Sequence, residues 1–129
     1  MAEVIEILRS PKMLSFATLI VAIAVNIAGE TTMKHGMNQV GELHLNVAGL
    51  FRAFSNPFVV TGLGVMFAAA LLWLRVISRE PLSWAYPMLA LGYIPLLFTS
   101  RGMLGEHISP ERWLGAIVII AGVALLFRS

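Results

Sequence analysis

The chain has 129 residues, of which 58% are hydrophobic and 12% are charged. Soluble domains average about 45–50% apolar and about 25% charged residues, so this composition argues against a soluble enzyme and against a disordered chain. It predicts an integral membrane protein. The formal net charge is +2, and the basic residues are scattered, which argues against a nucleic-acid partner. Cysteine is absent, which excludes disulfides and thiolate metal sites.

Four long apolar segments predict transmembrane helices over residues 13–34, 57–77, 82–102 and 110–127. A bilayer core of about 30 Å needs about 20 helical residues, and the segments lack the alternation of β-barrel strands. Basic residues precede the first segment as in a signal peptide, but the apolar run continues past any cleavage site, so we expect an uncleaved helix. The predicted fold class is an all-α membrane protein in which residues 1–129 form a single four-helix transmembrane domain.

Residues 43–55 separate the first two segments and place Leu43, Val47, Leu50, Phe51 and Phe54 at helical spacing. One apolar face on a short helix predicts an amphipathic helix lying at the membrane interface. Its simplest role is to anchor the protein.

The basic residues specify the orientation of the chain only weakly. Cytoplasmic loops carry an excess of Lys and Arg. One side of the membrane would hold Arg9, Lys12, Arg75, Arg79 and Arg128, and the other side Lys34, Arg52, Arg101 and Arg112. This near balance fits either a single orientation or two opposite insertions of the same chain, which would permit an antiparallel homodimer.

Glu30 is the outstanding residue, because a carboxylate inside an apolar segment is costly and marks a candidate functional site. Lys34 follows one helical turn later, so Glu30 either binds a cation or a proton, or pairs with Lys34 near the interface. Asn26 precedes Glu30 by one turn and either lines the same cavity or bonds a neighbouring helix. Arg101 falls on the same membrane side. Lys34 and Arg101 fit either a bound phosphate or ordinary lipid headgroups.

Two further segments contain breaks or small residues. Prolines remove backbone donors, so Pro87, Gly92 and Pro95 predict a bend and a candidate hinge in the third helix. Ser83 and Tyr86 add hydroxyl groups there as candidate substrate contacts. In the fourth helix Gly115, Ala121 and Gly122 either pack against another copy or form a groove inside the chain.

The residues contain no recognisable catalytic constellation, phosphate loop or HExxH motif. We therefore expect no enzymatic activity, no cofactor and no metal site. The histidines fall between the predicted helices, where surface roles are more common than ligation.

Three motifs resemble the drug/metabolite transporter superfamily and its EamA-type members. They are AGETTMK at residues 28–34, PLSWAYPMLALGY at 81–93 and LGEHISPERWLG at 104–115. The resemblance covers about residues 14–127. It implies a small four-helix transporter that works by alternating access in a dimer.

Two four-helix branches of this superfamily compete. Small multidrug resistance proteins are proton-coupled exporters of cationic compounds, but the alignment places Asn26 at their essential glutamate and Leu89 at their substrate-stacking tryptophan. The subunits that flip undecaprenyl-phosphate-linked aminoarabinose carry an Ala-Gly-Gln…Lys pattern and an Ala-Tyr-Pro-Met-Leu pattern. Residues 28–34 and 85–89 are more similar to this second branch.

The resemblance therefore favours a flippase for a polyprenyl-phosphate-linked sugar in the bacterial inner membrane, working as a homodimer or as a heterodimer with a paralogous subunit. Lys34 and Arg101 would hold the phosphate, and Glu30 would hold a sugar amine, a proton or a base. A proton-coupled exporter of small cations, such as polyamines, guanidinium compounds or quaternary ammonium drugs, is the alternative. A second alternative is an accessory subunit of a larger membrane complex.

Overall fold

The computed structural model describes the backbone of residues 1–129, and all side chains except those of Ile7, Leu8, Arg9 and Pro11. Every regular element in this described chain is helical. The elements in chain order are α1 (Ala2–Arg9), α2 (Pro11–Val40), α3 (Val47–Ser55), α4 (Pro57–Ile77), α5 (Leu82–Met88), the 3₁₀ helix η1 (Leu89–Gly92), α6 (Tyr93–Gly102) and α7 (Pro110–Arg128).

Four helical segments are long and apolar enough to cross a membrane, which confirms the predicted fold class. They are Lys12–Val40, Pro57–Ile77, Leu82–Gly102 and Pro110–Arg128. The first helix runs to Val40 instead of ending near residue 34. It ends at Gly41, whose φ of +91° lies in the left-handed region that favours glycine. The apolar segment therefore ends before the helix does, because the helix continues until it reaches a backbone stop signal.

The helix α3 occupies the position of the predicted interfacial helix but begins at Val47 instead of residue 43. Asn46 is the reason, because its side chain caps the helix by accepting a hydrogen bond from the Gly49 N–H at 2.7 Å. Asn56 then ends α3 and caps α4, and its amide group donates to Gln39 at 3.0 Å. This corner is thereby joined to the end of α2.

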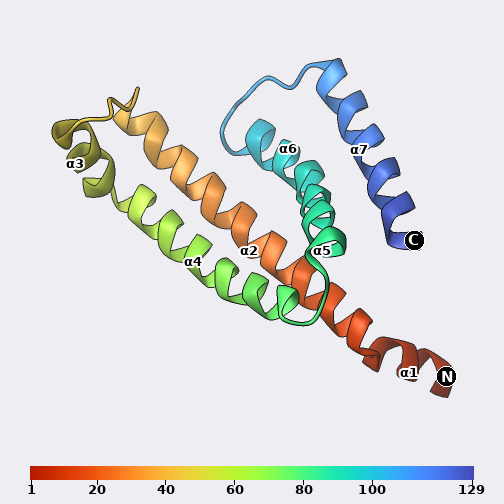
Figure 1. The fold of residues 1–129 in the computed structure, drawn as a ribbon. Helices are drawn as coiled ribbons and strands as arrows, with labels where there is room; N and C mark the ends of the chain where they lie inside the picture. Colours follow the sequence, from red (N-terminus) through yellow and green to blue (C-terminus); the bar gives the residue numbers. More distant parts are fainter.

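The long helices α2 and α4 lie side by side over most of their length, and α5–α6 and then α7 follow on one side (Figure 1). Gly62 of α4 sits against the backbone of Gly29 in α2. A methyl group on Gly62 would lie 2.6 Å from the Gly29 carbonyl oxygen, so only glycine permits this approach. Small residues at helix contacts are a common means of packing in membranes.

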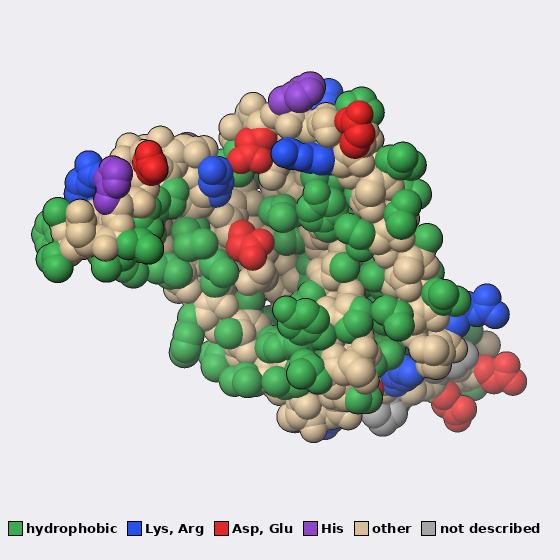
Figure 2. Space-filling model, turned by 45° about the horizontal axis from the view of Figure 1, so that its top comes forward, with side chains coloured by type: hydrophobic (Ala, Val, Ile, Leu, Met, Phe, Trp, Pro, Cys, Tyr) green, Lys and Arg blue, Asp and Glu red, His purple; other side chains and the backbone are tan. Residues whose placement is uncertain are grey.

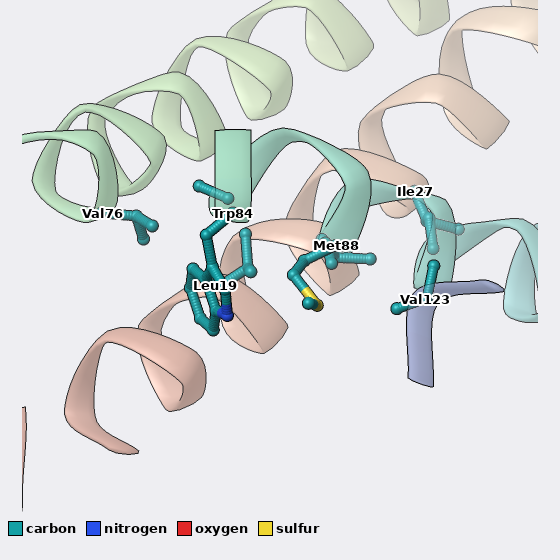
Figure 3. Packing of buried hydrophobic residues seen from close by; sticks show 8 residues of the cluster. Leu19, Ile27, Val76, Trp84, Met88 and Val123 are labelled. Carbon is teal, nitrogen blue, oxygen red and sulfur yellow. The ribbon is translucent and has the colours of Figure 1, made fainter. Parts of the chain in front are cut away.

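The largest cluster of buried side chains among the described residues brings together residues of all four spans (Figure 3). Leu19 and Met88 are fully buried in it, and Val76 is 1% exposed. The cluster consists of Leu19, Ile23, Ile27, Val76, Trp84, Ala85, Met88 and Val123. It fixes α5 against α2 and α4, whereas α7 contributes Val123 alone.

Candidate functional site

A cavity of about 740 Å³ lies between α2, α4 and the broken helix α5–η1–α6, with Ile119 of α7 at its wall. Ligand pockets of about 300–1,000 Å³ with an apolar lining and few polar groups are typical of small-molecule sites. The lining here fits that description, because most of its side chains are Ala, Ile, Leu, Met or aromatic residues.

Asn26 and Glu30 supply polar groups to this cavity from α2. The two residues are one helical turn apart, so their side chains emerge from the same face of the helix. Both are partly buried. Among the described side chains, Glu30 has no hydrogen-bond or ion-pair partner, and none joins it to Lys34. Its carboxylate is therefore free to meet a ligand in the cavity.

Aromatic side chains form another part of the cavity wall. Trp73 of α4 and Tyr86 of α5 meet edge to face, with ring centroids 6.4 Å apart, and Tyr93 of α6 lines the same cavity. Aromatic faces attract cations and stack on apolar surfaces. The wall can therefore bind a cationic or ring-shaped group beside the carboxylate.

The broken helix supplies the third wall of the cavity. Pro87, Leu89 and Gly92 line it, and the α-helical pattern changes to a 3₁₀ turn over Leu89–Gly92. A 3₁₀ stretch inside a helix often marks a hinge. The interruption predicted from the prolines is thus present, and it lies at the cavity itself.

Lys34 and Arg101 are exposed and lie outside the lining of the cavity. The Thr31 hydroxyl donates to the Thr99 hydroxyl at 3.1 Å, which joins α2 to α6 three residues before Lys34 and two residues before Arg101. They therefore share one end of the molecule. Figure 2 shows charged and histidine side chains gathered along the upper edge of the molecule, above a mostly hydrophobic region.

Ser83 lies apart from the other predicted contacts. It lines a separate cavity of about 370 Å³ with Lys12, Glu80 and Trp84, near the other end of α2. Three of the six predicted substrate contacts, Asn26, Glu30 and Tyr86, thus come together in the large cavity. Lys34 and Arg101 stand at one end of the molecule, and Ser83 stands near the other.

The contribution of α4 to the cavity is not apparent from the sequence pattern. The residues Met66, Ala69, Ala70 and Trp73 line it, and their spacing repeats at the three- and four-residue interval of one helix face. This interval was available in the sequence. However, α4 is apolar on all sides, so nothing in its pattern distinguishes this face from those that meet lipid.

Gly115, Ala121 and Gly122 of α7 are exposed, and methyl groups added to Gly115 and Gly122 would meet nothing within 4 Å. They do not form a packing groove inside the chain, which was one of the two readings of this pattern. In the described part of the chain, no group of three His, Cys, Asp or Glu residues is placed to hold a metal ion.

The chain is similar to bacterial proteins of one description. It is 35% identical over 75 residues to the "Probable 4-amino-4-deoxy-L-arabinose-phosphoundecaprenol flippase subunit ArnE" of Pseudomonas fluorescens, covering 58% of this chain and 66% of that protein. It is 39% identical over 71 residues to the ArnE protein of Aeromonas salmonicida, covering 55% of this chain and 62% of that protein. The chain thus spans less than two thirds of these relatives.

A longer alignment joins the chain to the ArnE protein of Salmonella typhimurium, with 29% identity over 108 residues, covering 84% of this chain and 92% of that protein. No protein-family model and no solved structure matches the chain. The resemblance to small drug/metabolite-transporter-type proteins is confirmed by these relatives. The chain is a multi-pass helical membrane protein that is similar in sequence to the ArnE flippase subunits.

Proposed function

We propose that the chain translocates a polyprenyl-phosphate lipid bearing an amino sugar across the bacterial inner membrane. The observation that carries this proposal is the position of Glu30 in a cavity of about 740 Å³, in a chain similar to subunits named for such a lipid. An exposed cationic pair, Lys34 and Arg101, stands at the end of the molecule toward which Glu30 lies.

The sugar headgroup occupies the cavity in this mechanism. A carboxylate in a membrane span is costly unless it is paired, and the ammonium group of an amino sugar offsets that cost at Glu30. Asn26 supplies a hydrogen-bonding amide one turn away, while Trp73 and Tyr86 offer aromatic faces to the ring. The headgroup thereby exchanges water for matched partners.

The phosphate binds at Lys34 and Arg101. Arginine bonds phosphate through two parallel N–H groups, and lysine adds a compact positive charge. The lipid tail remains in the bilayer, so only the headgroup has to enter between the helices.

Alternating access requires an element that moves, and the broken helix is the candidate. Pro87 and Pro95 flank the 3₁₀ segment, which ends at Gly92 and is also a wall of the cavity. A change in this segment would alter the wall and the opening together. The flexible break and the binding site therefore coincide.

The transporting unit is a dimer, either of two copies or of this chain with a paralogous subunit. The relatives are named as subunits, and α7 presents Gly115, Ala121 and Gly122 on its exposed surface. Such small residues allow close contact between membrane helices.

The test reconstitutes the full chain in vesicles that contain undecaprenyl-phosphate aminoarabinose. A membrane-impermeant, amine-reactive reagent is added outside the vesicles. It reports how fast inner-leaflet headgroups appear at the outer surface. We expect faster exchange than in empty vesicles, and we expect Lys34→Ala or Arg101→Ala to abolish it together with lipid binding in native mass spectrometry. Arg52→Ala is the matched control, because Arg52 lies on α3 outside the large cavity.

Unchanged lipid binding in both the Lys34 and the Arg101 variants would contradict the phosphate assignment. Exchange at the rate of empty vesicles, with and without a co-reconstituted paralogous subunit, would contradict lipid translocation. Exchange only with that subunit present would identify the working unit as a heterodimer.

A second candidate function is proton-coupled export of small cations, favoured by the aromatic side chains that line the same cavity as Glu30. Glu30→Gln separates the two functions. Glutamine retains an oxygen that accepts a hydrogen bond from an ammonium group, so lipid exchange should persist at a reduced rate. Proton-coupled export needs a carboxyl group that gains and loses a proton, so Glu30→Gln should abolish pH-driven uptake of spermidine or guanidinium into vesicles.

A further inference from the structure

A second cavity, of about 200 Å³, lies between the N-terminal half of α2 and the C-terminal end of α4. It is separate from the cavity that contains Glu30. Its lining consists of Leu14, Ser15, Thr18, Arg75, Val76 and Arg79. Two arginines and two hydroxyl residues thus surround a space far too small for a lipid tail but large enough for a phosphate group.

The charge of this cavity is positive. Arg75 and Arg79 are four residues apart, and Val76 between them is 1% exposed and packs in the core. The buried valine holds this side of α4 against α2 and brings both arginine stems to the junction. No acidic side chain is part of the described lining, and Glu80 lines a different cavity. The C-terminal end of a helix also stabilises cations, which allows both arginines to gather there.

The Ser15 hydroxyl supplies an independent observation. Ser15 is 4% exposed and lines the cavity, and among the described groups its hydroxyl oxygen has no hydrogen-bond partner. Buried hydroxyl groups are nearly always bonded, so an orphaned one calls for a ligand. Thr18 differs, because its hydroxyl donates to the Leu14 carbonyl at 2.9 Å. An oxygen of a phosphate would accept the hydrogen bond that Ser15 can donate.

The position of this small cavity can be compared with that of the first cationic pair, Lys34 and Arg101. At about 1.5 Å per residue, about 28 Å of helix separates Ser15 from Lys34 on α2, which is close to the ~30 Å thickness of a bilayer core. Figure 2 shows charged side chains at both ends of the molecule, with a hydrophobic region between them. The two cationic clusters therefore face opposite membrane surfaces.

We propose that Arg75, Arg79 and Ser15 form a phosphate-binding site at the membrane surface opposite Lys34 and Arg101. The arginines bind the phosphate oxygens, and Ser15 donates one further hydrogen bond. If the proposed lipid translocation is correct, on which this extension rests, the phosphate is received at one cluster and released from the other. The proposal thus places a phosphate-binding site at each end of the transport path.

The experiment measures how fast phenylglyoxal modifies each arginine of the full chain in phosphatidylcholine vesicles, with peptide mass spectrometry as the readout. Phenylglyoxal crosses membranes, and the inorganic phosphate is present on both sides of the vesicle membrane, so the orientation of the chain does not matter. One arm adds inorganic phosphate, and the other incorporates undecaprenyl phosphate into the vesicle. We expect several-fold slower modification of Arg75 and Arg79, while Arg128 is unchanged. Arg128 is the internal control because it is exposed near the same end of the molecule.

Two serine and threonine variants test the geometry. Ser15→Ala removes the unpartnered hydroxyl, and the phosphate concentration for half-protection should rise by about tenfold, the usual effect of losing one hydrogen bond to a charged group. Thr18→Val is the matched control, because the Thr18 hydroxyl already bonds its own helix. Its half-protection concentration should stay near that of the unchanged chain.

Protection in both arms supports a site for phosphate from any source, and protection by undecaprenyl phosphate alone supports a lipid headgroup site. No protection, or equal protection of Arg128, overturns the proposal, as does unchanged protection in Ser15→Ala. The vesicle exchange assay of the proposed function is independent. Protected arginines without lipid exchange would support the phosphate site and contradict translocation. Lipid exchange without protected arginines would support translocation and contradict the phosphate site.

Discussion

Gly62 and Gly64 are two residues apart on α4 but lie in different surroundings. A methyl group on Gly62 would lie 2.6 Å from the Gly29 carbonyl oxygen, whereas one on Gly64 would meet nothing within 4 Å. The neighbour of Gly62 is backbone, which cannot rotate away. The contact between α2 and α4 therefore depends on this one glycine and not on the other.

Gly62→Ala should lower the free energy of unfolding by about 1–3 kcal/mol, the usual cost of overpacking. Gly64→Ala is the matched control and should be neutral or slightly stabilising, because alanine favours a helix. Unfolding in mixed micelles with increasing SDS, followed by circular dichroism, measures both. Equal stability of the two variants would contradict the close contact of α2 with α4.

Thr31 and Thr32 also form a natural pair. The Thr31 hydroxyl bonds Thr99 across the helices at 3.1 Å, and the Thr32 hydroxyl bonds the Ala28 carbonyl of its own helix at 2.7 Å. A threonine hydroxyl in a helix can bond a carbonyl of its own preceding turn, and of these two only the Thr32 hydroxyl does so. Whether such a hydroxyl crosses to a neighbour depends on which helix face it occupies.

Thr31→Val should destabilise the protein by about 0.6 kcal/mol, the average for hydrogen bonds between membrane helices. Thr32→Val should change stability less, because its bond lies within one helix. A double-mutant cycle of Thr31→Val with Thr99→Val isolates the interaction. A coupling energy of zero would mean that the two hydroxyls are independent.

The broken third span is the element whose shape and function are most closely joined. Pro95 is exposed and is the third residue of α6, which follows the 3₁₀ segment Leu89–Gly92 without a gap. A proline inside a helix removes one backbone hydrogen bond and crowds the preceding turn. Substitution by alanine should restore a regular helix there.

Pro95→Ala should reduce lipid exchange several-fold while leaving lipid binding intact, because it stiffens the proposed moving element. Pro57→Ala is the control, because Pro57 lies in the first turn of α4, where proline disturbs no helical bond. The vesicle exchange assay gives the rate, and amide hydrogen exchange over residues 85–95 should slow. Wild-type exchange rates in Pro95→Ala would remove the hinge role of this residue.

At the scale of the whole molecule, α7 leaves most of its residues exposed. This helix contacts α5 and η1 (Figure 1), its Trp113 and Phe127 rings meet Phe98 of α6 and Phe16 of α2, and Ala116 and Val123 are its buried residues. In the proposed dimer, a second copy or a paralogous subunit would contact the side of α7 that the single chain leaves exposed. The exposed small residues provide a surface for that contact.

Gly115→Leu and Gly122→Leu should leave the fold of the single chain unchanged, because both positions face open space, and should weaken association with a partner chain. Native mass spectrometry in mild detergent should show a loss of dimer at equal helical content by circular dichroism. An unchanged dimer fraction would place the interface elsewhere. Leu114→Ala is the control, because it alters an exposed residue of α7 without filling the small-residue surface.

The positions of the four spans and the identity of Glu30 as the outstanding residue follow from the sequence by itself. Hydropathy, helix caps and an acidic residue in an apolar run are local signals, and they act over one or two helical turns. The sequence also determined the break near Pro87. The end of α2 required the backbone geometry of Gly41.

Only the tertiary structure decided which helix faces meet. In water the apolar stripe of a helix identifies its buried side, but in lipid every side is apolar, and the pattern of α4 does not distinguish Trp73 from a lipid-facing residue. The fold brings Trp73 to Asn26 and Glu30 and separates Ser83 from them. It also brings Ser15 and Arg75 to the same small cavity. That contact depends on the close approach of α2 and α4, which no local sequence signal indicates.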